Sequence, residues 1–360
     1  MEKRIKTIVY GGKLDKEIIL GGLLWLSKVG EELAKYEDME VIRIPGPKVG
    51  KNRLKNLWSA YINALKVLRM KPDAILLDAG KDGNAAIALL SKIISRKTRI
   101  YIPIHHYEPI RIGKHNVIGR LLAKILLAVT YKLNRELWER ASKIYVVSKA
   151  AGEEISEKLR IPKEKLILTG NSIEMINTNH FKIRKDIDFF CIGRIGKFSN
   201  LQNIWREIKR LKSNVKFHMA GMVKDRTITN ELTEIGGFKH HGVVNEKKKN
   251  ELFLRSKVFI FPSIYEGFGI AVGEALSYGL PVVVWDLPVY REIWGESEAV
   301  IRVKINDTQE FARKAVFALE NFNRLSKKAK ETSKKLKKSW RDIGKIVHDT
   351  IIEAFNAKRL

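Results

Sequence analysis

Several features are scarce or missing in this 360-residue chain, and each gap excludes a class of protein. The single cysteine, Cys191, excludes an internal disulfide framework and a cysteine-rich metal site, and it fits a reducing compartment. No run of 18 apolar residues occurs, so no membrane-spanning helix is expected. The amino-terminal segment is too short and too polar for a signal peptide and instead predicts a first strand. We therefore expect a soluble, cytoplasmic protein.

Acidic residues are outnumbered, because 68 Lys and Arg stand against 40 Asp and Glu, a net charge of +28. Such an excess favours anionic partners, which include nucleic acid, lipid headgroups and phosphorylated small molecules. The charge is spread over amphipathic helices, and residues 51–71 contain basic side chains but no acidic one. No recognised nucleic-acid-binding motif occurs, so we do not expect nucleic acid to be a partner.

Short apolar runs alternate with helical patterns over most of the chain, and 45% of the residues are hydrophobic. Continuous apolar runs are typical of parallel strands, and their alternation with helices indicates βαβ units. The expected strands are 5–10, 40–44, 74–78, 99–105, 143–148, 165–170, 188–193, 215–221, 258–263, 281–286 and 299–304. The polar stretch 177–188 separates two series. We predict an α/β protein with two doubly wound, Rossmann-like domains, residues 1–178 and 179–340, facing each other across a cleft.

The segment 258–292 carries the strongest functional signal. A buried strand ends at Pro262-Ser263, and a glycine-containing loop, Gly267-Phe268-Gly269, leads into a short helix. Glycines at a helix start leave backbone N–H groups open, and these groups with the helix dipole form a site for a diphosphate. Glu266 and Glu274 flank this loop, and a carboxylate can accept hydrogen bonds from both hydroxyls of a sugar diol. The alternative is that both glutamates are solvated charges at a helix end.

The same segment resembles the donor-binding signature of GT-B glycosyltransferases, specifically the retaining family 4 type (glycosyl transferases group 1). Every fixed letter of P-S-x-x-E-G-F-G-x-x-x-x-E-A-x-x-x-G-x-P-V occurs from Pro262 to Val282, and a D-x-P-x-x-x-E pattern follows from Asp286 to Glu292. The resemblance implies that Glu266 contacts the sugar hydroxyls as a catalytic residue. It also implies that the amides of Gly267, Phe268 and Gly269 bind the phosphates and that Glu274 holds the ribose.

The resemblance extends to the end of the first strand of the second domain. Gly193 lets the backbone approach a ligand, and Arg194 can grip a diphosphate in a bidentate manner. The family has a lysine five residues after this arginine, where the present chain has Ser199. Either a shortened loop lets Lys197 bind the donor instead, or the lysine is missing.

Three residues of the first domain match family positions. His105 follows the fourth strand, where the family has a histidine near the sugar, so it is a candidate catalytic residue with His106 adjacent. Gly21 and Gly22 begin a helix where the family has a glycine pair that contacts donor phosphates. Gly11-Gly12, directly after the first strand, compete for this role.

The resemblance implies a cofactor-free transfer from a UDP- or GDP-sugar to an acceptor hydroxyl, with retention of the anomeric configuration. No cluster of His, Asp or Glu has metal-ligand spacing, and His240-His241 is interpreted as a structural pair on a loop, so no metal is expected. Helix dipole, Arg194 and Lys197 would then stabilise the leaving diphosphate.

The acceptor side is predicted from surface charge. Residues 120–137 fit an amphipathic helix with a basic face, which is either an ordinary solvated face or a surface for anionic membrane. The membrane interpretation predicts a lipid-linked or glycan acceptor and a peripheral membrane location. The carboxyl-terminal helix, about 341–360, resembles the family's final helix, which returns to the first domain.

Two other functions fit part of this pattern. GT-B scaffolds also serve epimerases and phosphorylases, although the E-G-F-G string with its spaced second glutamate favours transfer. A non-enzymatic polyanion-binding protein is the other alternative.

Overall fold

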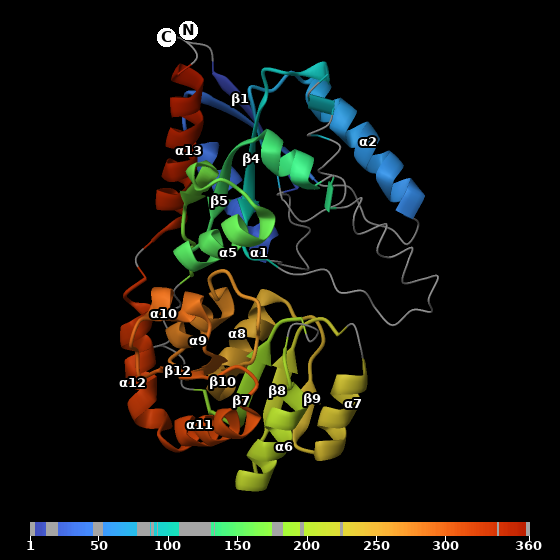
Figure 1. Cartoon of the computed structure of the whole chain (residues 1–360). Coiled ribbons are helices and arrows are strands. Elements are labelled where there is room, and N and C mark those ends of the chain that lie inside the picture. Colours follow the sequence, from blue (N-terminus) through green and yellow to red (C-terminus); the bar gives the residue numbers. More distant parts are fainter. Residues whose placement is uncertain are drawn as a thin grey trace. The chain divides into compact units, whose positions relative to one another are not determined.

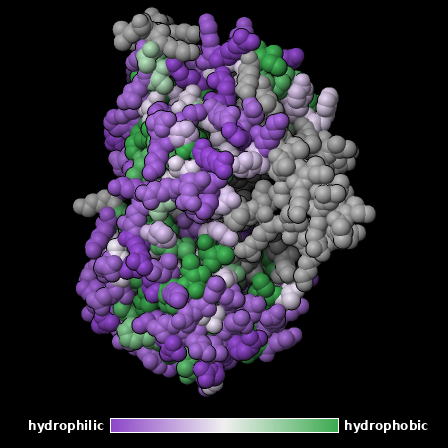
Figure 2. All heavy atoms as spheres, in the orientation of Figure 1, coloured by the Kyte–Doolittle hydropathy of each residue, from purple (hydrophilic) through white to green (hydrophobic). Residues whose placement is uncertain are grey.

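The computed structural model describes residues 4–11, 21–45, 53–77, 87, 90–91, 93–107, 131–132, 134–174, 183–194, 198–223, 226–336 and 338–357. The chain divides into two compact units (Figure 1). The first consists of Met1–Asn171 and Lys338–Leu360, and the second of Ser172–Lys337. Polar residues predominate on the face shown in Figure 2, as expected for a chain with 30% charged residues. No helix within the described ranges is long and apolar enough to cross a membrane.

The first unit is built on a parallel six-stranded sheet in the order β2-β1-β3-β4-β5-β6. Its central strands are buried because helices cover the sheet. The strands are β1 (Ile5–Tyr10), β2 (Met39–Ile44), β3 (Ala74–Leu77), β4 (Arg99–Ile104), β5 (Ala141–Val146) and β6 (Leu166–Leu168). The helices are α1 (Gly21–Leu33), α2 (Arg53–Arg69), α5 (Lys149–Leu159), the short 3-10 helix η1 (Lys163–Lys165) and α13 (Trp340–Asn356).

The last helix, α13, completes the first unit by packing on α1. It begins with a capping box in which Ser339 and Asp342 satisfy each other's backbone N–H groups. Gly344 allows the close approach, because a Cβ at this position would lie 2.5 Å from Cβ of Glu32. Further along, the ring of His348 stacks on Tyr36 at a centroid distance of 3.8 Å.

The second unit also has a parallel six-stranded sheet, in the order β12-β11-β10-β7-β8-β9. The strands are β7 (Ile187–Ile192), β8 (Phe217–Ala220), β9 (Phe238–His240), β10 (Ser256–Phe261), β11 (Val282–Trp285) and β12 (Val300–Val303). The helices are α6 (Leu201–Leu211), α7 (Arg226–Ile235), α8 (Glu246–Arg255), α9 (Ile270–Ser277), α10 (Pro288–Trp294), α11 (Thr308–Glu320) and α12 (Phe322–Ser333). This order is that of a Rossmann-like sheet, with its switch point between β7 and β10.

The predicted α/β class is confirmed, with two differences in detail. Strand β9 was not expected, because its three residues, Phe238, Lys239 and His240, form no apolar run. The sequence pattern also predicts a helix start near Phe268, and helix α9 begins two residues later, at Ile270. The predicted amphipathic helix 120–137 lies mostly outside the described residues. Its described part is helical, in residues 131–132 and 134–137, and the helix continues to residue 140.

Candidate functional site

The candidate site lies at the switch point of the second sheet. Strands β7 and β10 are parallel neighbours there, and the strand order runs outward from them in opposite directions, to β8 and β9 on one side and to β11 and β12 on the other. Ligands of doubly wound sheets bind beyond the carboxyl ends of strands at this point. Gly193 and Arg194 follow β7, and the loop that contains Glu266 follows β10. The two most characteristic sequence segments therefore meet at the edge where a ligand is expected.

Phe198 brings these two loops together. It forms an antiparallel bridge with Ser263, and the N–H of the next residue, Ser199, donates to the carbonyl of Pro262 at 2.9 Å. Gly193 has a φ of +153°, and a Cβ there would lie 2.9 Å from Cζ of Phe198, so a larger residue would push the loops apart. Lys197 lies in this loop but outside the described residues.

A second close backbone contact aligns the ends of β7 and β8. The N–H of Gly193 donates to the carbonyl of Ala220 at 3.0 Å, and that of Gly221 donates to the carbonyl of Gly242 at 2.7 Å. A Cβ on Gly221 would lie only 1.9 Å from the carbonyl oxygen of Gly193, at a φ of +126°. Gly221 was not singled out from the sequence, because a glycine after a strand has no motif of its own.

Replacing Gly221 by alanine is expected to destabilise the second unit by about 3 kcal/mol, because the methyl group collides with backbone that cannot rotate away. Gly242→Ala is the matched control, since its φ of +67° is also positive but nothing lies within 4 Å of the added Cβ. The control should lose only about 1 kcal/mol. Chemical denaturation of both variants measures the difference. Equal losses would show that conformation, and not the contact with Gly193, makes Gly221 necessary.

The start of α9 has no side-chain cap. Gly269 is the N-cap residue, with a φ of +83°. The first N–H groups of a helix have no partner within the helix, so an uncapped start is suited to a phosphate. A Cβ on Gly269 would lie 3.0 Å from Cε1 of Tyr290, which excludes larger residues. Gly267 and Gly269 are buried, and Phe268 is 5% exposed with its ring in the core.

Glu266 is half-buried and held at the same edge. Its Oε1 accepts a hydrogen bond from Oγ of Ser263 at 3.3 Å. Beneath it lies Tyr290, fully buried, whose pKa is raised well above its usual value first by burial and then by the negative charge of Glu266. Sequence patterns did not identify Tyr290 as a neighbour of this site.

Glu274 is not the solvated helix-end charge of the alternative interpretation. Its side chain is 22% exposed, and its Oε1 accepts from Nζ of Lys249, on α8, at 2.7 Å. Nζ of Lys249 also lies 2.9 Å from Oε2 of Glu246. Burial raises the pKa of Glu274, and the nearby lysine opposes that rise. Lys249 was missed because 25 residues separate it from Glu274 and it belongs to a lysine-rich helix without a motif.

The predicted residues of the first unit lie at the corresponding edge of its own sheet. His105 follows β4, is half-buried, and meets the ring of Trp25 edge-on at 6.1 Å. Gly21 and Gly22 form the start of α1. The N–H of Gly11 already donates to the carbonyl of Ile44 at 2.9 Å, so this amide is engaged within the sheet.

The interpretation of His240-His241 as a loop pair is wrong. His240 ends β9, and Nε2 of His241 lies 3.1 Å from Nδ1 of His218 on β8. Burial, and next the neighbouring His241, lower the pKa of His218 to about 4. The register of the strands explains the contact between His218 and His241. Strands β8 and β9 pair in parallel with His218 opposite Lys239, which is two residues before His241.

The two aspartates that could suggest a metal site each form an ion pair with a basic side chain. Asp186 and Asp188 form an aspartate pair separated by one residue. They lie at the amino end of β7, where Arg255 binds Asp186 and Lys257 binds Asp188. Among the described residues, no group of three or more His, Cys, Asp or Glu side chains could hold a metal ion.

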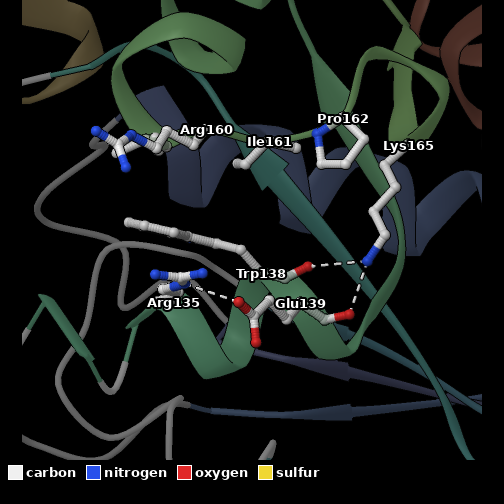
Figure 3. A pocket seen from close by; sticks show the side chains of 8 residues that line it. Arg135, Trp138, Glu139, Arg160, Ile161, Pro162 and Lys165 are labelled. Carbon is white, nitrogen blue, oxygen red and sulfur yellow. Dashed lines mark hydrogen bonds and ion pairs between the residues drawn. The ribbon is translucent and has the colours of Figure 1, made fainter.

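A separate cavity of about 210 Å³ lies in the first unit (Figure 3). Its wall combines apolar, basic and acidic side chains, from Arg135, Trp138, Glu139, Leu159, Arg160, Ile161, Pro162 and Lys165. Lys165 donates to the backbone carbonyl of Glu139 at 2.7 Å, and Arg135 pairs with the carboxylate of Glu139 at 2.7 Å. The cavity lies at the amino ends of β5 and β6, opposite to the edge where doubly wound sheets bind ligands. We therefore do not assign it to the donor.

Residues 173–338 match the family model described as glycosyl transferases group 1. This part of the chain is similar to glycosyltransferase domains. The matched region contains the whole of the switch-point site, from Gly193 to Glu274.

A curated relative and two solved structures are similar to this chain in sequence and in fold, respectively. The chain is 25% identical over 205 residues to the O-antigen chain mannosyltransferase RfbU of Salmonella typhimurium, an alignment that covers 53% of each chain. The chain thus spans about half the length of this curated relative. Sucrose-phosphate synthase of Thermosynechococcus elongatus has a TM-score of 0.70 at 14% identity, covering 99% of this chain and 100% of that chain. HepE of Anabaena in complex with UDP and glucose has a TM-score of 0.68 at 12% identity, covering 97% and 99%. The predicted GT-B fold is confirmed.

Proposed function

We propose that the chain transfers a sugar from a nucleotide-diphosphate-sugar to an acceptor hydroxyl. The observation that carries this proposal is the uncapped start of α9, flanked by Glu266 and Glu274 at the switch point within the matched region. A relative named as a mannosyltransferase and a structural neighbour that contains UDP and glucose support the same substrate class.

Each part of the donor has a candidate partner. Glu266 accepts hydrogen bonds from the sugar hydroxyls, and the amides from Gly267 to Gly269 bind the diphosphate. Glu274 binds the ribose, which requires it to share its carboxylate between the ribose hydroxyls and Lys249. The remaining donor-binding candidates are Gly193, Arg194, Lys197, Gly21 and Gly22, and His105 is the catalytic candidate of the first unit.

The proposed mechanism is that of a retaining, family 4 enzyme that works without a metal. Breaking the bond between the anomeric carbon and the diphosphate places negative charge on the leaving oxygens. The amides at the start of α9 and the guanidinium of Arg194 would stabilise that charge. The acceptor attacks the face from which the diphosphate leaves, and the leaving phosphate accepts the acceptor proton. No dedicated carboxylate base is then required.

We place the acceptor, a glycan or a lipid-linked glycan, at the surface of an anionic membrane. Supporting this, the chain carries a net charge of +28, and an excess of basic residues draws a protein to anionic lipid headgroups. The protein would then be peripheral, on the cytoplasmic face.

A thermal-shift screen with UDP, GDP and ADP tests the proposal. One diphosphate at about a hundred times its Kd should stabilise the protein by about 2.7 kcal/mol and raise Tm by several degrees. The sugar form of that nucleotide should then be consumed slowly in water and faster with an acceptor glycan. A chain that responds to none of these nucleotides and releases no sugar would contradict the proposed function.

A further inference from the structure

Helix α2 is apolar on two opposite faces. The inner face packs into the core of the first unit through four buried residues, Ala60, Ala64, Val67 and Leu68. The outer face carries Trp58, which is 67% exposed, and Tyr61, which is 42% exposed. At 100° per residue, half-buried Ile62 and Leu65 lie on the same outer face as Trp58. A soluble surface helix normally presents polar residues there, so the outer face of α2 has the composition of a contact surface.

The charged residues of this segment are all basic. Lys66 and Arg69 in the last turn are exposed, as is Lys71 directly after the helix. No acidic residue occurs from 51 to 71, so nothing on this segment neutralises them. Trp and Tyr concentrate where a bilayer meets water, and Lys and Arg bind lipid phosphates from the same depth.

We infer that α2 lies in the headgroup region of an anionic membrane, with Trp58 and Tyr61 inserted between lipids and the basic residues on phosphates. The helix has 17 residues and runs along the outside of the first unit (Figure 1), so it can lie flat on a bilayer. This inference deepens the proposed function, because it names the surface that brings the enzyme to a membrane-bound acceptor.

Other partners fit the outer face less well. The rings of Trp58 and Tyr61 stack on each other at 6.0 Å and 20°, so each ring offers at most one free face to a nucleic-acid base or a sugar. A second copy of this chain would have to place the same basic cluster against itself, which like-charge repulsion opposes. An anionic bilayer accommodates aromatic, aliphatic and basic side chains on one helix face at the same time.

Vesicle flotation tests the inference. The full chain is mixed with phosphatidylcholine vesicles with or without phosphatidylglycerol, as wild type and as the double variant Trp58→Ser/Tyr61→Ser. Wild type should float with the anionic vesicles, less so with added salt, and the double variant should bind them about tenfold more weakly. Phe317→Ser is the matched control, because Phe317 of α11 is 44% exposed but belongs to the second unit. It should bind as wild type does.

Insertion is distinguished from surface adsorption by brominated lipids, which quench tryptophan fluorescence on contact. Trp58→Phe should keep vesicle binding but lose most of the quenching. The inference is overturned if wild type ignores anionic vesicles or if the double variant binds them as wild type does. It is also overturned if the substitutions abolish RNA binding or dimerisation while vesicle binding is unchanged. The thermal shift with nucleotide, measured on every variant, reports separately on the proposed function and should not change.

Discussion

Replacing Glu266 by glutamine is expected to abolish sugar transfer and leave the protein folded. Glutamine keeps the oxygen that accepts from Ser263, so the loop after β10 should hold its position. It loses the charge that binds sugar hydroxyls as positive charge develops on the sugar ring. Removal of one preorganised electrostatic group lowers kcat by about 10²- to 10³-fold. The measurement is the transfer rate at saturating donor, together with Tm.

The control for this prediction is Glu234→Gln, which removes a carboxylate from the exposed surface of α7 in the same unit. This variant should retain wild-type kcat. Donor binding by Glu266→Gln should weaken much less than kcat falls, because the diphosphate contacts stay in place. Full turnover by a folded Glu266→Gln protein would refute the assignment of Glu266.

The second large effect concerns the ion pair beneath the proposed ribose site. Lys249→Met removes the cation at 2.7 Å from Glu274 and leaves a largely buried carboxylate without its partner. We expect a loss of about 2 kcal/mol, less than for a completely buried pair, because the two side chains are 17% and 22% exposed. Donor affinity should also fall, because a protonated Glu274 accepts ribose hydroxyls poorly.

The pH dependence identifies the cause of this loss. Burial raises the pKa of Glu274, so the native state holds this proton to a higher pH than the unfolded chain does, and stability falls as pH rises through that range. Removing Lys249 raises this pKa further, so the deficit of the variant should be largest at neutral pH. It should shrink toward about pH 4, where unfolded glutamates are protonated.

Lys248→Met is the matched control, since its ion pair with Glu251 is about two-fifths exposed on both sides. Exposed pairs contribute about 0.5 kcal/mol or less, so this variant should be almost as stable as wild type at every pH. A Lys249→Met deficit that does not depend on pH would show that packing, and not the charge of Glu274, causes it. Thermal unfolding of both variants across pH gives the comparison.

Much of the fold could be predicted because the informative features are local. The run VFIFPS and the similar apolar runs along the chain are typical of buried parallel strands. β9 escaped prediction because Phe238–His240 is stabilised by pairing with β8 and not by its own composition. The glycine pattern of the α9 loop could be recognised in the sequence because a helix start is formed by consecutive residues. The same consecutive residues supply the backbone N–H groups that can bind an anion.

Sequence by itself determined the α/β class and the segment from Pro262 to Glu274, because both depend on neighbours within a few positions. Tertiary structure alone decided three interactions: the ion pair of Lys249 with Glu274, the close approach of Gly221 to the carbonyl of Gly193, and the electrostatic effect of Glu266 on Tyr290. Each joins residues about 24 to 28 positions apart, which meet only when strands and helices of one sheet come into register. The outward direction of Trp58 was decided in the same way, because a helix with apolar residues on both faces does not reveal which face the core takes.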